Sequence, residues 1–294
     1  MNFKRSIAAI VAAVLTVTLS ARAEWIVEKG EVLAFLGDSI TQQGQTQPVG
    51  YVNLVLQTLA KEGVEIKPVK AGISGHKSND MLNRLDRDVL SKGAKVMTLS
   101  CGVNDVWHQD SGRGVSLEDY KKNVTEILDK CAASNCTVVV MTASMFQYRG
   151  WEKDPHNVKL APYNDFLREI AAERKLPLAD INKAMWDAYA ADPGGKLTAD
   201  GVHMRWPGNF LMAKCILVAL GADPAKLADY EKDWRTISGG AEMKFALSLD
   251  EMEKLDAAAA KMGEGDKAAD FVRVRCGLTD SKGKVRETMP DPVK

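Results

Sequence analysis

The chain has 294 residues, with 39 basic and 39 acidic side chains, so its formal charge at neutral pH is zero. This balance gives no indication of the broad basic surface that binds nucleic acid or anionic membranes, and we expect neither partner. The length suits one large domain with a substantial core, or one domain with an appendage.

The first 23 residues have the pattern of a secretory signal peptide. Lys4 and Arg5 precede an apolar run over residues 7–19, and a small-residue Ala-x-Ala pattern ends at Ala23. The run is shorter than the roughly 20 apolar residues that span a bilayer, and no lipoprotein cysteine follows it closely. We therefore expect cleavage after Ala23, a secreted or periplasmic protein, and no membrane insertion after cleavage. The mature chain would carry a formal charge of −3, because this segment holds three basic and no acidic residues.

Short apolar runs then alternate with segments of helical periodicity, which is typical of a parallel sheet flanked by helices. Strands are predicted at residues 32–36, 64–69, 96–100 and 137–142, with a shorter fifth strand near 177–181. The fourth run is apolar almost throughout, as expected for a strand covered on both faces.

Three segments have apolar residues at helical spacing. The clearest runs from Leu117 to Cys131, with Ser116 as its predicted N-cap. A second helix is predicted around residues 163–171, and a third, over residues 212–220, closes the core.

The character of the sequence changes beyond Pro224. We divide the chain into a signal peptide (1–23), a main domain (24–222) and a C-terminal helical and hairpin appendage (223–294). Within the appendage, Ser248 and Glu251 have the spacing of a capping box, and alternation around Val272 predicts a hairpin.

The chain has five cysteines, an odd number, so at least one is unpaired unless an intermolecular bond forms. Cys131 and Cys136 flank a predicted helix-to-strand turn and are the best candidates for a disulfide in an exported protein. Buried free thiols are the equal alternative.

Four short signatures, far apart in the sequence, supply the parts that acyl transfer needs: a nucleophile, a base, a group that orients the base, and donors for an oxyanion. They are Gly37-Asp38-Ser39, Gly72-Ile73-Ser74-Gly75, Gly102-Val103-Asn104-Asp105 and Asp200-Gly201-Val202-His203. Three of them follow successive predicted strands, whose carboxyl ends meet at one edge of a parallel sheet. The fourth precedes the closing helix, so all four are expected to converge on one site.

Ser39 is the candidate nucleophile, His203 the candidate base and Asp200 the candidate orienting group. The aspartate three residues before His203 is placed to bond one ring nitrogen while the other faces the serine. A backbone carbonyl is the alternative orienting group, and we assign Asp38 to bracing the turn. The remaining histidines are interpreted as loop or surface imidazoles: His76, His108 and His156.

The four signatures resemble the sequence blocks of the SGNH (GDSL-type) hydrolase family, over residues 31–220. The resemblance implies a flavodoxin-like three-layer α/β/α sandwich with a central, mainly parallel five-stranded sheet. It also implies hydrolysis of esters or thioesters without a metal or organic cofactor. The oxyanion would be held by the backbone N–H groups of Ser39 and Gly75 and by the side-chain amide of Asn104.

The substrate is less defined. Secreted members of the family often remove acetyl groups from glycans, so we expect an esterase that acts on acyl, most simply acetyl, esters of carbohydrates or other small molecules. Four aromatic residues in predicted loops near the signatures are either stacking platforms for sugar rings or local packing: Trp107, Tyr148, Trp151 and Trp206. The alternative enzymes are a lysophospholipase, a thioesterase or a short-chain lipase, and the alternative class is a non-catalytic carbohydrate-binding protein. The sequence does not indicate the oligomeric state, the natural acyl group and alcohol, or the regiospecificity.

Overall fold

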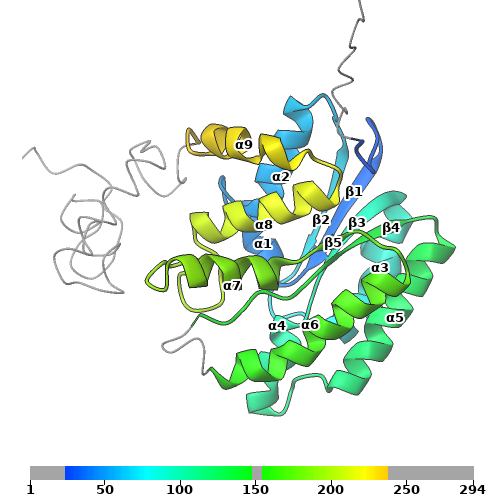
Figure 1. The fold of residues 1–294 in the computed structure, drawn as a ribbon. Helices are drawn as coiled ribbons and strands as arrows, with labels where there is room; N and C mark the ends of the chain where they lie inside the picture. The colour runs from blue at the N-terminus through cyan, green and yellow to red at the C-terminus, as the bar shows by residue number, and fades with distance from the viewer. Residues whose placement is uncertain (1–23, 148–153, 238–294) are drawn as a thin grey trace, which may run out of the picture.

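The centre of the protein is a five-stranded parallel sheet (Figure 1). The computed structural model describes residues 24–147 and 154–237. The strands are β1 (Val32–Gly37), β2 (Lys67–Gly72), β3 (Ala94–Ser100), β4 (Thr137–Met141) and β5 (Leu178–Ala179). Their order is β2-β1-β3-β4-β5, and each neighbouring pair is parallel. This flavodoxin-like order confirms the predicted α/β architecture.

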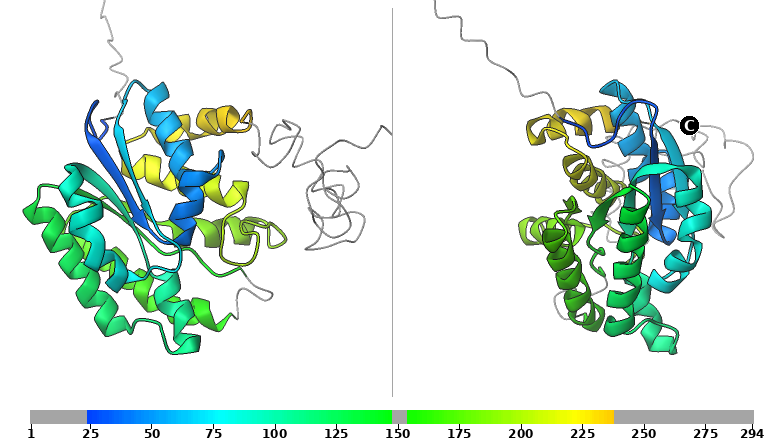
Figure 2. Two further views of the ribbon diagram at one scale, coloured as in Figure 1. Left: turned by 180° about the vertical axis from the view of Figure 1, so that it is seen from behind. Right: turned by 90° about the vertical axis from the view of Figure 1, so that its right-hand side faces the viewer.

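Helices cover both faces of the sheet and form the outer layers (Figures 1 and 2). One layer contains α1 (Ser39–Thr46), α2 (Tyr51–Lys61), α7 (Ile181–Ala191), α8 (Trp206–Ala219) and α9 (Leu227–Trp234). The other contains α3 (Ser78–Asp88), α5 (Leu117–Ala133) and α6 (Pro155–Glu173). Shorter helical segments are α4 (Val103–Trp107), η1 (Leu90–Lys92), η2 (His108–Ser111) and η4 (Pro224–Lys226).

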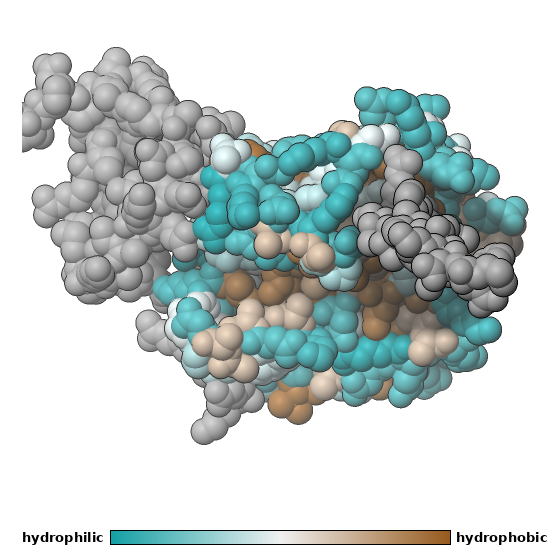
Figure 3. Space-filling model, turned by 45° about the horizontal axis from the view of Figure 1, so that its top comes forward, coloured by the Kyte–Doolittle hydropathy of each residue, from teal (hydrophilic) through white to brown (hydrophobic). Residues whose placement is uncertain are grey.

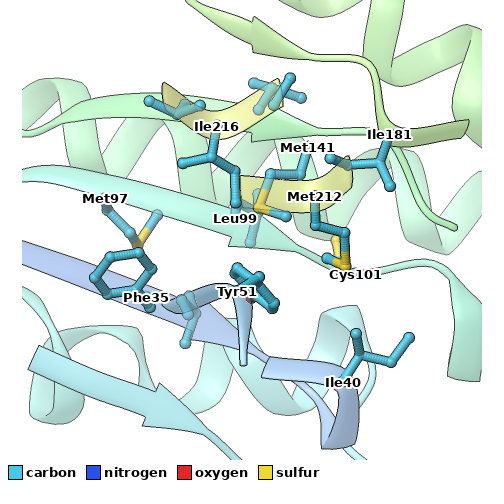
Figure 4. Packing of buried hydrophobic residues seen from close by; sticks show 14 of the residues in the cluster. Phe35, Ile40, Tyr51, Met97, Leu99, Cys101, Met141, Ile181, Met212 and Ile216 are labelled. Carbon is cyan, nitrogen blue, oxygen red and sulfur yellow. The ribbon is translucent and has the colours of Figure 1, made fainter. Parts of the chain in front are cut away.

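The hydrophobic core lies between the sheet and these helices. Residues 33–36 of β1 and 138–141 of β4 are buried, which explains why both runs are apolar on both faces. In Figure 4, Ile216 of α8 lies over Leu99 of β3, and Met212 of α8 lies beside Cys101. Core side chains therefore pack against both faces of β1 and β3. The first and third sequence signatures lie at the carboxyl ends of these two strands.

The surface is mostly hydrophilic in the view of Figure 3, with hydrophobic residues gathered in a recess between hydrophilic rims. Large apolar side chains that are exposed include Ile26 before β1, Val158 of α6 and Val218 of α8. Among residues 24–147 and 154–237, no helix is long and apolar enough to cross a membrane.

β2 begins at Lys67, three residues later than predicted from the apolar run at 64–69. Val64 instead closes the turn after α2, where its N–H donates to the Leu59 carbonyl at 2.8 Å. Val64 and Ile66 pack against the core without pairing in the sheet. β2 is an edge strand with an exposed first half, so its composition does not carry the apolar signal of the central strands.

The three predicted helices are present, and two of them start earlier than predicted. α5 begins at Leu117, and the Ser116 hydroxyl accepts from the Asp119 N–H at 3.1 Å, which confirms the predicted N-cap. α6 starts eight residues before the predicted range, because Asp154 caps it and Pro155 occupies its first turn. α8 starts at Trp206 rather than at residue 212, again with a proline in its first turn.

The first part of the predicted appendage packs against the main core. Tyr230 and Trp234 of α9 are buried, and the Trp234 indole N–H donates to the Thr58 hydroxyl of α2 at 3.1 Å. The domain division at residue 222 stays a prediction. The predicted signal peptide, the helix after Ser248 and the hairpin around Val272 lie outside the described residues.

Cys131 and Cys136 flank the turn between α5 and β4, as predicted. Both are buried free thiols in the structure, and the Cys136 N–H donates to the Cys131 carbonyl at 2.9 Å across the turn. Cys101 is also a buried free thiol, and burial raises its pKa well above the usual range.

Candidate active site

The chain turns sharply from β1 into α1 at Gly37-Asp38-Ser39. A Cβ at Gly37 would lie 1.9 Å from the Thr41 hydroxyl oxygen, so this close approach requires glycine. The Asp38 carboxylate caps α1 by accepting the Ile40 N–H at 2.9 Å. Burial raises the pKa of Asp38 to about 6. Ser39, 9% exposed, is the first residue of α1, at the carboxyl end of a central strand.

The structure brings the three predicted triad residues together. The Ser39 Oγ lies 2.9 Å from His203 Nε2, and His203 Nδ1 lies 2.6 Å from Asp200 Oδ2. One imidazole thus joins a hydroxyl to a carboxylate. This arrangement lets a histidine take the serine proton while the carboxylate holds the ring orientation.

The loop that carries Asp200 and His203 is held in shape by its own hydrogen bonds. The second Asp200 oxygen, Oδ1, accepts the N–H groups of His203 and Val202 at 2.8 and 3.0 Å. Gly201 has a φ of +93°, a conformation that favours glycine. Burial opposes ionisation of Asp200, but the bonds from the His203 ring and the two N–H groups outweigh it, and its pKa lies below the usual value. The carboxylate is therefore charged beside the imidazole at neutral pH.

The other two predicted oxyanion residues, Gly75 and Asn104, follow β2 and β3, the strands on either side of β1. Gly75 has a φ of +76°, and a Cβ built there meets no atom within 4 Å. Asn104 is buried in α4, and its amide donates to the His76 carbonyl at 3.1 Å. A side-chain amide carries two N–H donors, and this bond uses one of them.

Hydrogen bonds tie the signatures to each other. The Gly37 carbonyl accepts the Ile73 N–H at 3.1 Å, which joins the end of β1 to the loop after β2. The buried Asp105 carboxylate accepts the N–H groups of Gly102 and Ser78 at 3.1 and 3.0 Å. Burial raises the pKa of Asp105 despite these bonds. The loops that carry Ser39, Gly75 and Asn104 thus form one connected network.

Gln147 supports the histidine loop and carries no signal in the sequence. Its side-chain oxygen accepts the N–H groups of Leu197 and Thr198 at 2.9 and 2.8 Å, and its amide donates to the Gly195 carbonyl at 2.7 Å. Its own N–H donates to the Gly201 carbonyl at 2.7 Å. Gln147 belongs to no motif with a recognisable spacing, so the sequence alone does not indicate its supporting role.

Two glutamines of α1 hold the Gly75 loop in the same way. Gln42 accepts the Ser74 N–H at 3.1 Å. Gln45 both donates to the Gly72 carbonyl and accepts its N–H, each at 3.2 Å. Their spacing of three residues places them on one face of α1, but only the pairing of β2 with β1 shows what that face meets.

The other three histidines lie at different positions in the fold. His76 directly follows Gly75, and His108 begins η2. His156 sits between two carboxylates, with Nε2 2.6 Å from Asp110 and Nδ1 2.8 Å from Asp154. In the part of the chain that the structure describes, no group of three or more His, Cys, Asp or Glu side chains is placed to hold a metal ion.

The predicted loop positions of Trp107 and Trp206 are wrong. Trp107 ends α4 and packs against the core. Trp206 begins α8, with its ring 5.2 Å from that of Phe210 and with the Arg235 guanidinium 5.1 Å from its centre. Trp107 is the last residue of the helix that begins within the third signature, and Trp206 starts the helix that follows the fourth. Tyr148 and Trp151 lie outside the described residues.

Comparisons with known proteins agree on one family. A sequence model of the GDSL-like lipase/acylhydrolase family matches residues 35–209. The acetylxylan esterase of Geobacillus stearothermophilus is 27% identical over 210 residues, 65% of this chain and 94% of that protein. The solved structure of the acetyl xylan esterase AlAXEase is 30% identical, with a TM-score of 0.60 over 64% of this chain and 99% of its own.

Axe2, an acetylxylan esterase from Geobacillus stearothermophilus, is a further structural relative. A catalytic mutant of it is 25% identical, with a TM-score of 0.61 over 67% of this chain and 97% of its own. Its catalytic mutants replace a serine, an aspartate or a histidine by alanine, and that aspartate stands three residues before that histidine.

Proposed function

The chain belongs to the GDSL-like lipase/acylhydrolase family and is a carboxylic ester hydrolase, and from this premise we propose that Ser39, His203 and Asp200 are its catalytic triad. The observation that carries the proposal is the continuous contact from the Ser39 hydroxyl through the His203 ring to the Asp200 carboxylate. The same Asp-x-x-His spacing occurs at the catalytic positions of Axe2.

The first step forms an acyl-enzyme. Ser39 Oγ attacks the ester carbonyl carbon while His203 Nε2 takes the hydroxyl proton. Asp200 bonds Nδ1–H and stabilises the imidazolium. The tetrahedral intermediate then expels the alcohol, which receives the proton from Nε2, and the acyl group stays on Ser39.

The second step releases the acid. Water takes the place of the alcohol and gives a proton to His203 Nε2 as its oxygen attacks the acyl carbon. Collapse of the second tetrahedral intermediate returns that proton to Ser39 Oγ. In both steps the oxyanion is held by the N–H groups of Ser39 and Gly75 and the amide of Asn104. The N–H of Ser39 belongs to the first turn of α1, whose positive end favours a negative ligand.

We propose that the substrates are acetylated carbohydrates and that the protein is exported. The substrate class is supported by two similar proteins, the acetylxylan esterase of Geobacillus stearothermophilus and AlAXEase. Export is supported by the signal-peptide pattern that ends at Ala23.

Acetate release from acetylated xylooligosaccharides, beside a chain-length series of p-nitrophenyl esters, tests the triad and the substrate class. We expect the wild type to release acetate, Ser39→Ala to have no turnover, and Ser91→Ala to match the wild type. Ser91 is a suitable control because its hydroxyl is exposed and bonds only locally, to the Arg87 carbonyl at 2.8 Å. Turnover by Ser39→Ala would refute the triad. Activity restricted to long acyl chains would refute the substrate class alone.

A further inference from the structure

Arg84 is a buried arginine on α3 that lies between the two halves of the candidate site. Its side chain is 4% exposed, and each of its three nitrogens has a different partner. Nε donates to His76 Nδ1 at 3.0 Å, one terminal nitrogen donates to the Gly37 carbonyl at 2.9 Å, and the other pairs with Asp88 at 3.2 Å. Two of these three partners belong to the loops that carry the chemistry.

The bond to the Gly37 carbonyl fixes the backbone close to the nucleophile. The Gly37 carbonyl is the last of β1, two residues before Ser39, and it also accepts the Ile73 N–H. The peptide from which the chain turns into α1 is therefore fixed from two directions. A displacement of this peptide would move the Ser39 backbone N–H and the hydroxyl together.

The bond to the His76 ring fixes a residue beside the proposed oxyanion donors. His76 directly follows Gly75, and its carbonyl accepts from the Asn104 amide at 3.1 Å. The orientation of His76 thus affects both the peptide next to Gly75 and the Asn104 amide. Because Nδ1 accepts from Arg84, the ring carries no proton at that nitrogen. Burial of the ring, together with the neighbouring guanidinium, lowers the pKa of His76 and favours this neutral form.

We propose that Arg84 is a positioning residue, which fixes Ser39 relative to the oxyanion donors of Gly75 and Asn104. The inference rests on the proposed function of those three residues. A guanidinium suits this task because it is planar and presents several N–H donors in a fixed geometry, whereas a lysine has one nitrogen on a flexible stem. Burial disfavours the charged guanidinium and lowers the pKa of Arg84. A role in packing alone would be met by an apolar side chain without this cost.

The steady-state kinetics of Arg84→Lys and Arg84→Met on p-nitrophenyl acetate test the proposal. We expect kcat to fall about 10- to 100-fold in both variants with KM little changed, as for a small misplacement of catalytic groups. Arg87→Met is the matched control, because Arg87 is an exposed arginine one turn further on α3 whose side chain bonds Asp88. The control should keep the wild-type kcat.

Melting temperature separates positioning from stability. Arg84→Lys keeps the charge near Asp88, so we expect it to melt closer to the wild type than Arg84→Met while its kcat stays low. His76→Ala provides a second variant that leaves Arg84 in place. It removes only the ring acceptor, and kcat should again fall without a matching loss of thermal stability. If kcat follows the melting temperature across these variants, or if Arg84→Lys has the wild-type kcat, the proposal is wrong.

Backbone hydrogen exchange gives a readout that does not depend on turnover. We expect the amides of residues 72–78 to exchange faster in Arg84→Lys and His76→Ala than in Arg87→Met. Unchanged exchange there would overturn the inference even if the triad assignment holds. A wild type without esterase activity, but with the expected exchange pattern, would instead refute the proposed function and leave the positioning role of Arg84 supported.

Discussion

Gly75→Ala tests whether the backbone N–H at this position serves the reaction. Gly75 has a φ of +76°, where an alanine costs about 1–2 kcal/mol. A Cβ there meets no atom within 4 Å, so backbone strain is the main expected perturbation. The loop can relieve the strain by rotating away from positive φ, which turns the N–H away from the site.

The size of the effect follows from that strain. If 1–2 kcal/mol favours the rotated form, the fraction of molecules with an aligned N–H falls about 5- to 30-fold, at 1.36 kcal/mol per tenfold change. We expect kcat on p-nitrophenyl acetate to fall by the same factor. This lies below the roughly 10²- to 10³-fold effect of removing an oxyanion donor outright.

Gly93→Ala is the matched control for this prediction. Gly93 has nearly the same φ, +75°, also without any atom within 4 Å of a built Cβ, and it caps η1 away from the signatures. There we expect the strain to lower the melting temperature by a few degrees while kcat stays at the wild-type value. If Gly75→Ala keeps full kcat and loses only as much stability as Gly93→Ala, the Gly75 N–H has no part in catalysis.

Three further predictions concern other parts of the molecule. Asn104→Ala should lower kcat about 10²-fold with little change in KM, and a kcat within twofold of the wild type would remove it from the oxyanion hole. The raised pKa of Asp38, about 6 against the usual 3.8, means that the folded protein holds a proton that the unfolded chain releases between about pH 4 and 6. Stability should therefore fall as pH rises through this window, by at most about 3 kcal/mol, and urea midpoints of Asp38→Asn should not show this fall. Trp234→Ala should cost about 3–5 kcal/mol of stability, because the indole is 2% exposed and bonds Thr58; a variant as stable as the wild type would show that α9 is not part of the core.

The fold was predictable where the sequence pattern reflects burial on both faces. The runs that became β1, β3 and β4 are apolar because helices cover the sheet on both sides. β2 was misplaced by three residues because its position at the edge leaves half of it exposed. The earlier starts of α6 and α8 depend on prolines in their first turns, which apolar periodicity does not register.

The candidate site was predictable where its residues form local motifs. Asp200 and His203 are three residues apart, so their contact depends on one short loop and can be anticipated from spacing. Arg84 and Gln147 act through partners that are distant in sequence, such as Gly37 and Thr198. Their roles depend on the packing of α3 and of the loop after β4, and no single-sequence pattern encodes that packing.

The most direct test of the triad assignment is covalent labelling with a fluorophosphonate, with the modified residue identified by peptide mass spectrometry. We predict a single adduct on the Ser39 hydroxyl of the folded wild type, absent from Ser39→Ala and formed far more slowly in His203→Ala. Equal labelling of Ser39→Ala, or an adduct on another side chain, would contradict the account.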